Sequence, residues 1–209
     1  MKLSWSHKLF FKINKQIGKR PLWDTFMIFC ARWLIRILVA IFAIWLFFSD
    51  QNIFYPEIVI GENGFLREQS FLQFFNIIFF FFVIIFSFLM NYIFALIWRR
   101  PRPIKEFPEI NTLIHTMGTW KSFPSDHTIS SVILLFGVFW FGMPLWAVFL
   151  FSLSVILIPF SRIFVGVHYP RDIVGGFVFA LLGFLLSLGF VLLFNVNSFL
   201  TQLYLEYIL

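Results

Sequence analysis

Charged residues are scarce in this sequence. Asp, Glu, Lys and Arg together make up 12 % of its 209 residues, whereas a soluble domain carries about 25 %. Because a soluble protein needs polar groups to cover its surface, this shortage excludes an ordinary cytosolic enzyme and a disordered chain. Cysteine is scarcer still. The single residue, Cys30, cannot form an internal disulfide, so a disulfide scaffold is excluded as well.

Apolar residues dominate instead. They make up 60 % of the sequence, and Phe alone contributes 34 residues. A globule of this size cannot bury that much apolar surface. Runs close to the length of about 20 residues that a bilayer requires occur at five places: about 26–48, 71–97, 128–142, 145–160 and 173–194. The sequence therefore predicts an all-α fold, a polytopic membrane helix bundle with about five transmembrane helices.

The N-terminus is basic and amphipathic. Lysines recur at helical spacing over residues 7–19, with apolar residues between them: Lys8, Lys12, Lys15 and Lys19. This pattern is typical of a helix lying in the headgroup layer, and Arg20-Pro21 is expected to end it. We divide the chain into a basic amphipathic segment (1–23), a membrane domain (24–195) and a short C-terminal tail (196–209).

Five crossings place three polar parts of the chain on one side of the membrane. These parts are the N-terminus, segment 98–127 and segment 161–172. The formal net charge is +6, and the basic residues flank membrane spans. We therefore expect the partners to be the bilayer and a phosphate-bearing lipid rather than nucleic acid. The sequence leaves the oligomeric state open.

The first polar cluster is Arg99-Arg100-Pro101-Arg102-Pro103, at the end of the second span. The planar guanidinium group suits phosphate oxygens. An anchoring role at lipid headgroups is an equal alternative.

The second cluster runs from Lys121 to His127, just before the third span. Ser125 or Asp126 is suited to cap that helix, and the amides of a first helical turn form a ready anion site. His127 lies in that turn and can transfer a proton. The alternative is an ordinary capped helix with a histidine that takes no part in chemistry.

The third cluster, Ser161 to Asp172, precedes the last span and contains Arg162. His168 and Asp172 are four residues apart at a helix start. Asp172 can therefore accept a hydrogen bond from one imidazole nitrogen and leave the other directed at a substrate. The alternative is a buried His–Asp pair that only joins two helices.

These clusters resemble the motifs of the type 2 phosphatidic acid phosphatase superfamily of membrane lipid phosphatases over about residues 24–194. That family carries Lys-x6-Arg-Pro, Pro-Ser-Gly-His and Ser-Arg-x5-His-x3-Asp. The third motif is complete from Ser161 to Asp172, and the second is present with Asp126 in place of glycine. The Ser-Asp-His form resembles the subgroup that dephosphorylates undecaprenyl diphosphate. In the first motif Arg102-Pro103 fits, but Ala95 stands where the lysine is expected.

The resemblance implies a phosphatase domain with His168 as the nucleophile, Asp172 as its orienting partner and His127 as the proton donor. Arg102, Arg162 and Ser125 would hold the phosphate oxygens. The resemblance implies neither a metal nor another cofactor. We expect Lys121 to supply the charge that Ala95 lacks, while Arg100 is a further candidate for binding phosphate.

Several alternatives remain open. The substrate is expected to be undecaprenyl diphosphate, with phosphatidylglycerophosphate or phosphatidate next; a lipid phosphotransferase and a non-catalytic protein of the same fold are the other readings. Arg32 and Arg36, one turn apart in the first span, either bind a lipid headgroup or extend to anionic lipids. Counting basic residues places the site in the cytoplasm. The resemblance implies a multi-pass protein of the bacterial cell membrane with its site on the outer face, which is the orientation we favour.

Overall fold

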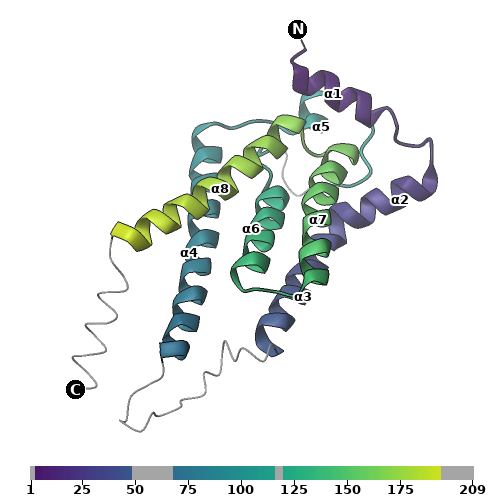
Figure 1. Cartoon of the computed structure of the whole chain (residues 1–209). Helices are drawn as coiled ribbons and strands as arrows, with labels where there is room; N and C mark the ends of the chain where they lie inside the picture. Colours follow the sequence, from purple (N-terminus) through teal and green to yellow (C-terminus); the bar gives the residue numbers. More distant parts are fainter. Residues whose placement is uncertain (1–2, 49–67, 116–119, 194–209) are drawn as a thin grey trace, which may run out of the picture.

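The computed structural model describes residues 3–48, 68–115 and 120–193, and all regular structure in these residues is helical (Figure 1). The elements are α1 (Trp5–Asn14), α2 (Pro21–Phe29), the π-helical η1 (Cys30–Leu34), α3 (Ile35–Phe48), α4 (Glu68–Ile97), α5 (Pro103–Glu106), α6 (Asp126–Trp140), α7 (Leu145–Phe164) and α8 (Pro170–Leu193). The predicted all-α class is confirmed. The predicted tail, 196–209, lies outside the described residues.

Four helical stretches in the described residues are long and apolar enough to cross a membrane: Pro21–Phe48, Phe75–Ile97, Leu145–Phe164 and Pro170–Leu192. They correspond to four of the five predicted spans. The remaining predicted span, 128–142, corresponds to α6, which has only 15 residues. Since α6 packs against α3, α4, α7 and α8, protein rather than lipid surrounds much of it, and a short helix suffices there.

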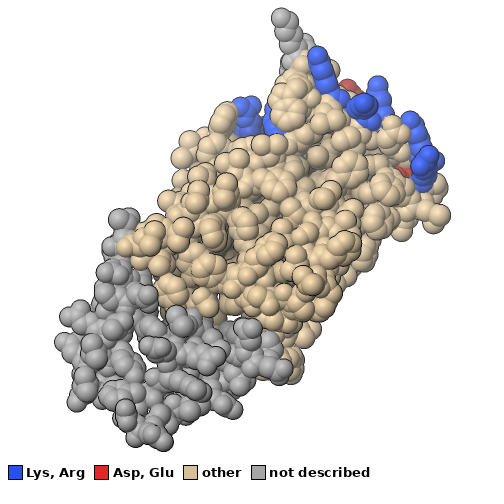
Figure 2. Space-filling model, viewed as in Figure 1, with Lys and Arg blue, Asp and Glu red and all other residues tan. Residues whose placement is uncertain are grey.

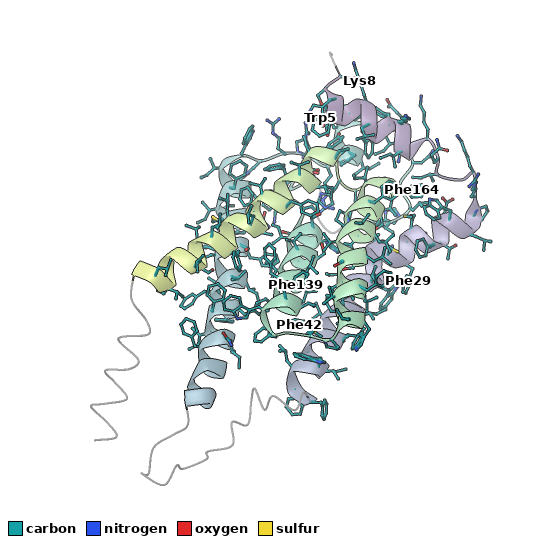
Figure 3. The ribbon with its side chains drawn as sticks, in the orientation of Figure 1. Trp5, Lys8, Phe29, Phe42, Phe139 and Phe164 are labelled. Atoms are coloured by element: carbon teal, nitrogen blue, oxygen red, sulfur yellow. The ribbon has the colours of Figure 1, made fainter. Side chains whose placement is uncertain are left out.

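Aromatic side chains fill the interior around α6. Phe42, Phe80 and Phe151 are buried in the same cluster as Ile133 and Val138 of α6. Gly137 makes this packing possible, because a side-chain carbon there would lie 2.6 Å from the Phe42 ring. Figure 3 shows Phe42 low in the bundle, at the level where α6 ends. The polar clusters of the sequence lie at the other end.

The sequence predicts an N-terminal helix over residues 7–19, and the predicted end of this helix is wrong. Helix α1 stops at Asn14, whose side-chain amide donates to the Asn111 carbonyl (2.7 Å). The chain then turns through Gly18, which has a φ of +83°. Pro21 was expected to end a helix but begins α2 instead, because the first helical position needs no backbone N–H.

The polar segments meet at one end of the bundle. Helices α1 and α5, the end of α7 and the start of α8 lie together there, and the α6–α7 turn lies at the opposite end (Figure 1). Backbone hydrogen bonds join the segments, from Ser122 N–H to Arg100 O (2.8 Å) and from Leu113 N–H to Val165 O (3.2 Å). Most Lys and Arg side chains visible in Figure 2 gather at this end.

This arrangement makes a prediction about topology. Lys8 and Leu145 are exposed at opposite ends of the bundle, while the native Cys30 is buried and gives little background. In sealed cells, a membrane-impermeant thiol reagent should label Lys8→Cys directly and Leu145→Cys only after permeabilisation. Labelling of both variants from one side would contradict the five crossings. The reverse pattern would place the polar end in the cytoplasm.

Candidate active site

His168 lies in the short connection between α7 and α8, where Gly166 turns the backbone with a φ of +85°. Its side chain is 3 % exposed. The imidazole Nδ1 lies 2.9 Å from the Ser122 carbonyl oxygen and 3.6 Å from Asp172 Oδ2. A carbonyl can only accept, so Nδ1 carries the hydrogen and Nε2 keeps its lone pair. The hydrogen bond that orients His168 was predicted to come from Asp172 but is made with the Ser122 carbonyl. Asp172 in turn accepts from the Ser122 hydroxyl.

Asp172 holds the segments of the site together. Its Oδ2 accepts from Ser122 Oγ (2.5 Å) and from Tyr169 N–H (2.8 Å). Its backbone carbonyl accepts from Ser125 N–H (3.1 Å). These bonds fix the segment before α6 against the start of α8. Sequence reasoning missed the role of Ser122, because 46 residues separate it from His168 and no spacing rule connects them.

Two glycines let α8 approach this segment closely. A side-chain carbon on Gly176 would lie 2.6 Å from Thr128 Cβ, and one on Gly175 would clash with the Phe123 ring. Small residues at such positions allow helices and loops to pack at short range. The start of α6 is thereby brought next to His168.

Ser125 occupies the N-cap position of α6 with extended backbone, but its side chain makes no capping hydrogen bond. The first amides of a helix have no partner within the helix, and the helix dipole favours negative charge there. His127 lies in this first turn, half-buried and within electrostatic reach of Arg162, His168 and Arg102. The predicted second cluster is thus next to the third.

Two arginines complete the cluster. Arg162 donates from NH1 to the Ala31 carbonyl (3.0 Å), and Arg102 donates from Nε to the Lys121 carbonyl (3.1 Å). Of the buried side-chain atoms that have no hydrogen-bond partner among the described residues, three donors belong to this cluster: Arg102 NH1, Arg162 Nε and Ser125 Oγ. A buried donor left unpaired costs about 1–3 kcal/mol. Several of them beside a histidine suit an anion with several oxygens, such as a phosphoryl group.

The surroundings of His168 keep its imidazole neutral. Burial lowers the pKa of His168 to about 4, and the charges of Arg162 and Arg102 act in the same direction. The nearby Asp172 carboxylate opposes this shift but does not cancel it. At neutral pH the Nε2 lone pair is therefore available.

Asp126 is neutralised by Lys121, which forms an ion pair with it. Lys121 Nζ and Asn91 Nδ2 both donate to Asp126 Oδ1, at 2.7 Å and 2.5 Å. Asn91 gave no signal in the sequence, because it lies in an apolar run of α4. Ala95, where the motif has lysine, is buried.

Arg100 is placed differently from the prediction. Its guanidinium lies over the Trp98 ring, 4.5 Å from the centroid, as Arg99 lies over Trp120 at 5.9 Å. The hydrogen bond that it makes to the site comes from its backbone carbonyl, which accepts from Ser122 N–H. A tryptophan face attracts a cation, which accounts for this position.

Arg32 and Arg36 are exposed on the first span. Arg36 lies over Trp33, 5.0 Å from the ring centroid. Arg32 follows Ala31, whose carbonyl accepts from Arg162. The structure describes no hydrogen bond from either side chain to the buried cluster within residues 3–48, 68–115 and 120–193, and their headgroup role stays a prediction. The same residues contain no group of three or more His, Cys, Asp or Glu that could hold a metal ion.

Comparisons with known proteins find relatives of this chain. A 98-residue stretch is 37 % identical to undecaprenyl-diphosphatase BcrC of Bacillus subtilis (strain 168), and covers 46 % of this chain and 48 % of that protein. Another match is 41 % identical over 91 residues to bacitracin transport permease protein BcrC of Bacillus licheniformis, and covers 42 % and 40 %. The chain thus spans about half the length of the curated relatives it matches.

The fold has a solved counterpart. The crystal structure of Aquifex aeolicus LpxE superposes with a TM-score of 0.64 at 22 % identity, covering 90 % of this chain and 97 % of that chain. The sequence profile described as PAP2 superfamily matches residues 76–196, more than half of the chain and all of the site around His168 and Asp172. The chain is therefore a multi-pass membrane protein that belongs to the PAP2 superfamily, as the resemblance of its three motifs predicts.

Proposed function

We propose that this protein is a metal-independent lipid phosphatase that removes the terminal phosphate of undecaprenyl diphosphate through a phosphohistidine at His168. The observation that carries the proposal is the set of buried, unpaired donors of Arg102, Arg162 and Ser125 around a neutral imidazole. The similarity to a protein named undecaprenyl-diphosphatase supports the substrate.

In the first step the Nε2 lone pair of His168 attacks the terminal phosphorus. A bond forms between nitrogen and phosphorus, and the bond from phosphorus to the bridging oxygen breaks. The lipid monophosphate leaves with the electron pair and can take up a proton from solvent. Arg102, Arg162 and the first amides of α6 stabilise the charge on the three non-bridging oxygens. The Ser122 carbonyl and Asp172 stabilise the positive imidazole.

In the second step water attacks the phosphohistidine. His127, acting as a base, removes a proton from the water as the new oxygen–phosphorus bond forms. The nitrogen–phosphorus bond breaks and its electron pair returns to His168. Inorganic phosphate is released and His127 passes its proton to solvent, after which both histidines are neutral and available for another turnover.

Purified protein assayed on a panel of lipid phosphates tests this function. We expect kcat/KM to be highest for undecaprenyl diphosphate, ahead of phosphatidylglycerophosphate and phosphatidate, and to persist in excess chelator. His168→Ala should lower phosphate release by about 1,000-fold or more, because the nucleophile is lost. His127→Ala should accumulate phosphate bound to the protein. The lipid monophosphate is a good leaving group that hardly needs an acid, whereas the attacking water needs a base.

The control is His115→Ala, because His115 is exposed and outside the three motifs. This variant should retain wild-type turnover. Near wild-type release by His168→Ala would exclude the nucleophile, and activity lost to chelator and restored by metal would exclude the metal-free reaction. Absence of release from every lipid would exclude the phosphatase itself.

The neutral state of His168 also predicts a pH dependence of stability. An unfolded histidine has a pKa of about 6.5, and His168 in the folded protein has one of about 4. Between these values the unfolded state binds the proton more strongly, so the folded state loses stability as the pH falls from 6.5 towards 4. His168→Asn removes this contribution. Between pH 7 and pH 5 its melting temperature in detergent should fall less than that of the wild type, and an equal fall would contradict a neutral buried His168.

Lys121 is proposed to contact the second phosphate of a diphosphate, the one that stays on the lipid when the terminal phosphate is transferred. Its ammonium is held beside the first turn of α6 by Asp126, and its carbonyl fixes Arg102. The Asp126 side chain is 45 % exposed, so the pair lies at the entrance of the site. A monophosphate lipid has no second phosphate to reach this position.

We therefore expect Lys121→Met to reduce kcat/KM on undecaprenyl diphosphate about tenfold more than on undecaprenyl monophosphate or phosphatidate. Lys121→Arg should retain most of the preference, and Lys105→Met, which removes an exposed charge on the nearby α5, serves as the control. Equal losses on both classes of lipid would reject the role of Lys121 in selectivity.

A further inference from the structure

Glu106, the last residue of α5, forms a cluster of polar contacts outside the phosphate site. Its Oε2 accepts from the Tyr169 hydroxyl at 2.9 Å. Its Oε1 lies 3.4 Å from His7 Nε2, and Arg171 NH2 lies 3.9 Å from Oε2. None of these contacts belongs to the proposed chemistry. The cluster joins α1, α5 and the start of α8.

Tyr169 connects this cluster to the proposed nucleophile. It follows His168 in the chain and its side chain is fully buried. At one end its backbone N–H donates to Asp172 Oδ2 (2.8 Å), and at the other its hydroxyl donates to Glu106. Burial and the Glu106 carboxylate raise the pKa of Tyr169, which keeps the hydroxyl a donor. A residue held at both ends has little freedom to move.

Glu106 is in turn tied to Arg102. Helix α5 is a single turn, Pro103–Glu106, and Arg102 is its N-cap. The backbone N–H of Glu106 donates to the Arg102 carbonyl (3.2 Å). The bond from Tyr169 to Glu106 therefore links the segment that carries His168 to the segment that carries Arg102. Tyr169 and Glu106 are 63 residues apart in the chain, so this bond connects two distant segments.

Helix α1 covers this link. His7 is 5 % exposed, and its ring packs edge-on against Tyr169 with centroids 5.0 Å apart. Phe10 packs on the same tyrosine at 5.2 Å. Ser6 Oγ accepts from the Arg171 N–H (3.1 Å). The opposite face of α1 is exposed and carries Trp5 and Lys8 (Figure 3). Excluding water strengthens a buried hydrogen bond.

We infer that Tyr169 and Glu106 are positioning residues, which hold His168 in register with Arg102 across the phosphate site. The inference rests on the proposed phosphatase function. Neither side chain needs to touch the substrate. Misplacing reacting groups by about 1 Å can cost about 100-fold in rate, so loss of this link lowers kcat more than it weakens substrate binding.

The test compares Tyr169→Phe, Glu106→Ala and Glu106→Gln with the wild type on undecaprenyl diphosphate. Tyr169→Phe removes one oxygen and keeps the ring packing. Glu106→Gln keeps an acceptor oxygen at the same reach. We expect kcat to fall about tenfold or more in Tyr169→Phe and Glu106→Ala with KM changed by less than about threefold, and Glu106→Gln to recover most of the rate.

The double variant Tyr169→Phe/Glu106→Ala should have a kcat no lower than that of the slower single variant, because both changes remove the same hydrogen bond. Matched controls are Tyr92→Phe and Glu109→Ala, which make the same changes at exposed positions. A kcat of folded Tyr169→Phe within about twofold of the wild type would overturn the inference. So would an equal loss in Glu106→Gln and Glu106→Ala, or additive losses in the double variant.

Hydrogen exchange tests the link between the two segments independently of the proposed phosphatase function. Tyr169→Phe should speed amide exchange both in residues 165–172 and in residues 103–107, whereas Tyr92→Phe should leave both segments unchanged. Unchanged exchange in Tyr169→Phe would overturn the link whatever the activity. If the wild type releases phosphate from no lipid but the coupled exchange is present, the phosphatase function fails and the link between the two segments remains.

Discussion

The buried carboxylate of Asp172 is the group on which the rest of the site depends. It accepts from Ser122 Oγ and Tyr169 N–H, and the backbone of the same residue accepts from Ser125 N–H. A buried carboxylate is costly unless it is paired, so the segment before α6 must stay against α8 to satisfy it. That position also puts the Ser122 carbonyl on His168 Nδ1. One charge thereby fixes the tautomer of the imidazole and the distance between two motifs that are far apart in the sequence.

The cluster of Arg102, Arg162 and Ser125 has the opposite character, because each of these residues leaves one polar atom unsatisfied. Arg102 NH1, Arg162 Nε and Ser125 Oγ are buried without a hydrogen-bond partner in the described part of the chain. Each lowers stability. In the proposed function each is already desolvated before the phosphate binds, which limits the reorganisation that binding requires. The surrounding aromatic core and the Asp172 junction hold these groups in place despite that cost.

The sequence predicts the spans and the motif residues because both are local signals. The length of an apolar run can be compared directly with the thickness of a bilayer. His168 and Asp172 are four residues apart, a spacing that brings their side chains close together at the start of a helix. What it cannot predict depends on contacts between distant segments. Ser122 meets His168 across 46 residues, and the Asn14–Asn111 bond at the end of α1 spans 97. Arg100 has the residue type suited to phosphate, but a neighbouring indole holds it elsewhere.

Charge balance connects the site to turnover. Arg102, Arg162 and Lys121 contribute three positive charges, and Asp126 and Asp172 contribute two negative ones, so with neutral histidines these five groups sum to +1. Without Asp126 the sum would be +2 and would match a phosphate dianion closely. A site that binds the product as tightly as the transition state gains nothing in kcat. For the proposed phosphatase, we therefore expect the carboxylate that replaces the glycine of the family motif to weaken the hold on released phosphate, and its pairing with Lys121 to keep a cation at the entrance for the arriving lipid.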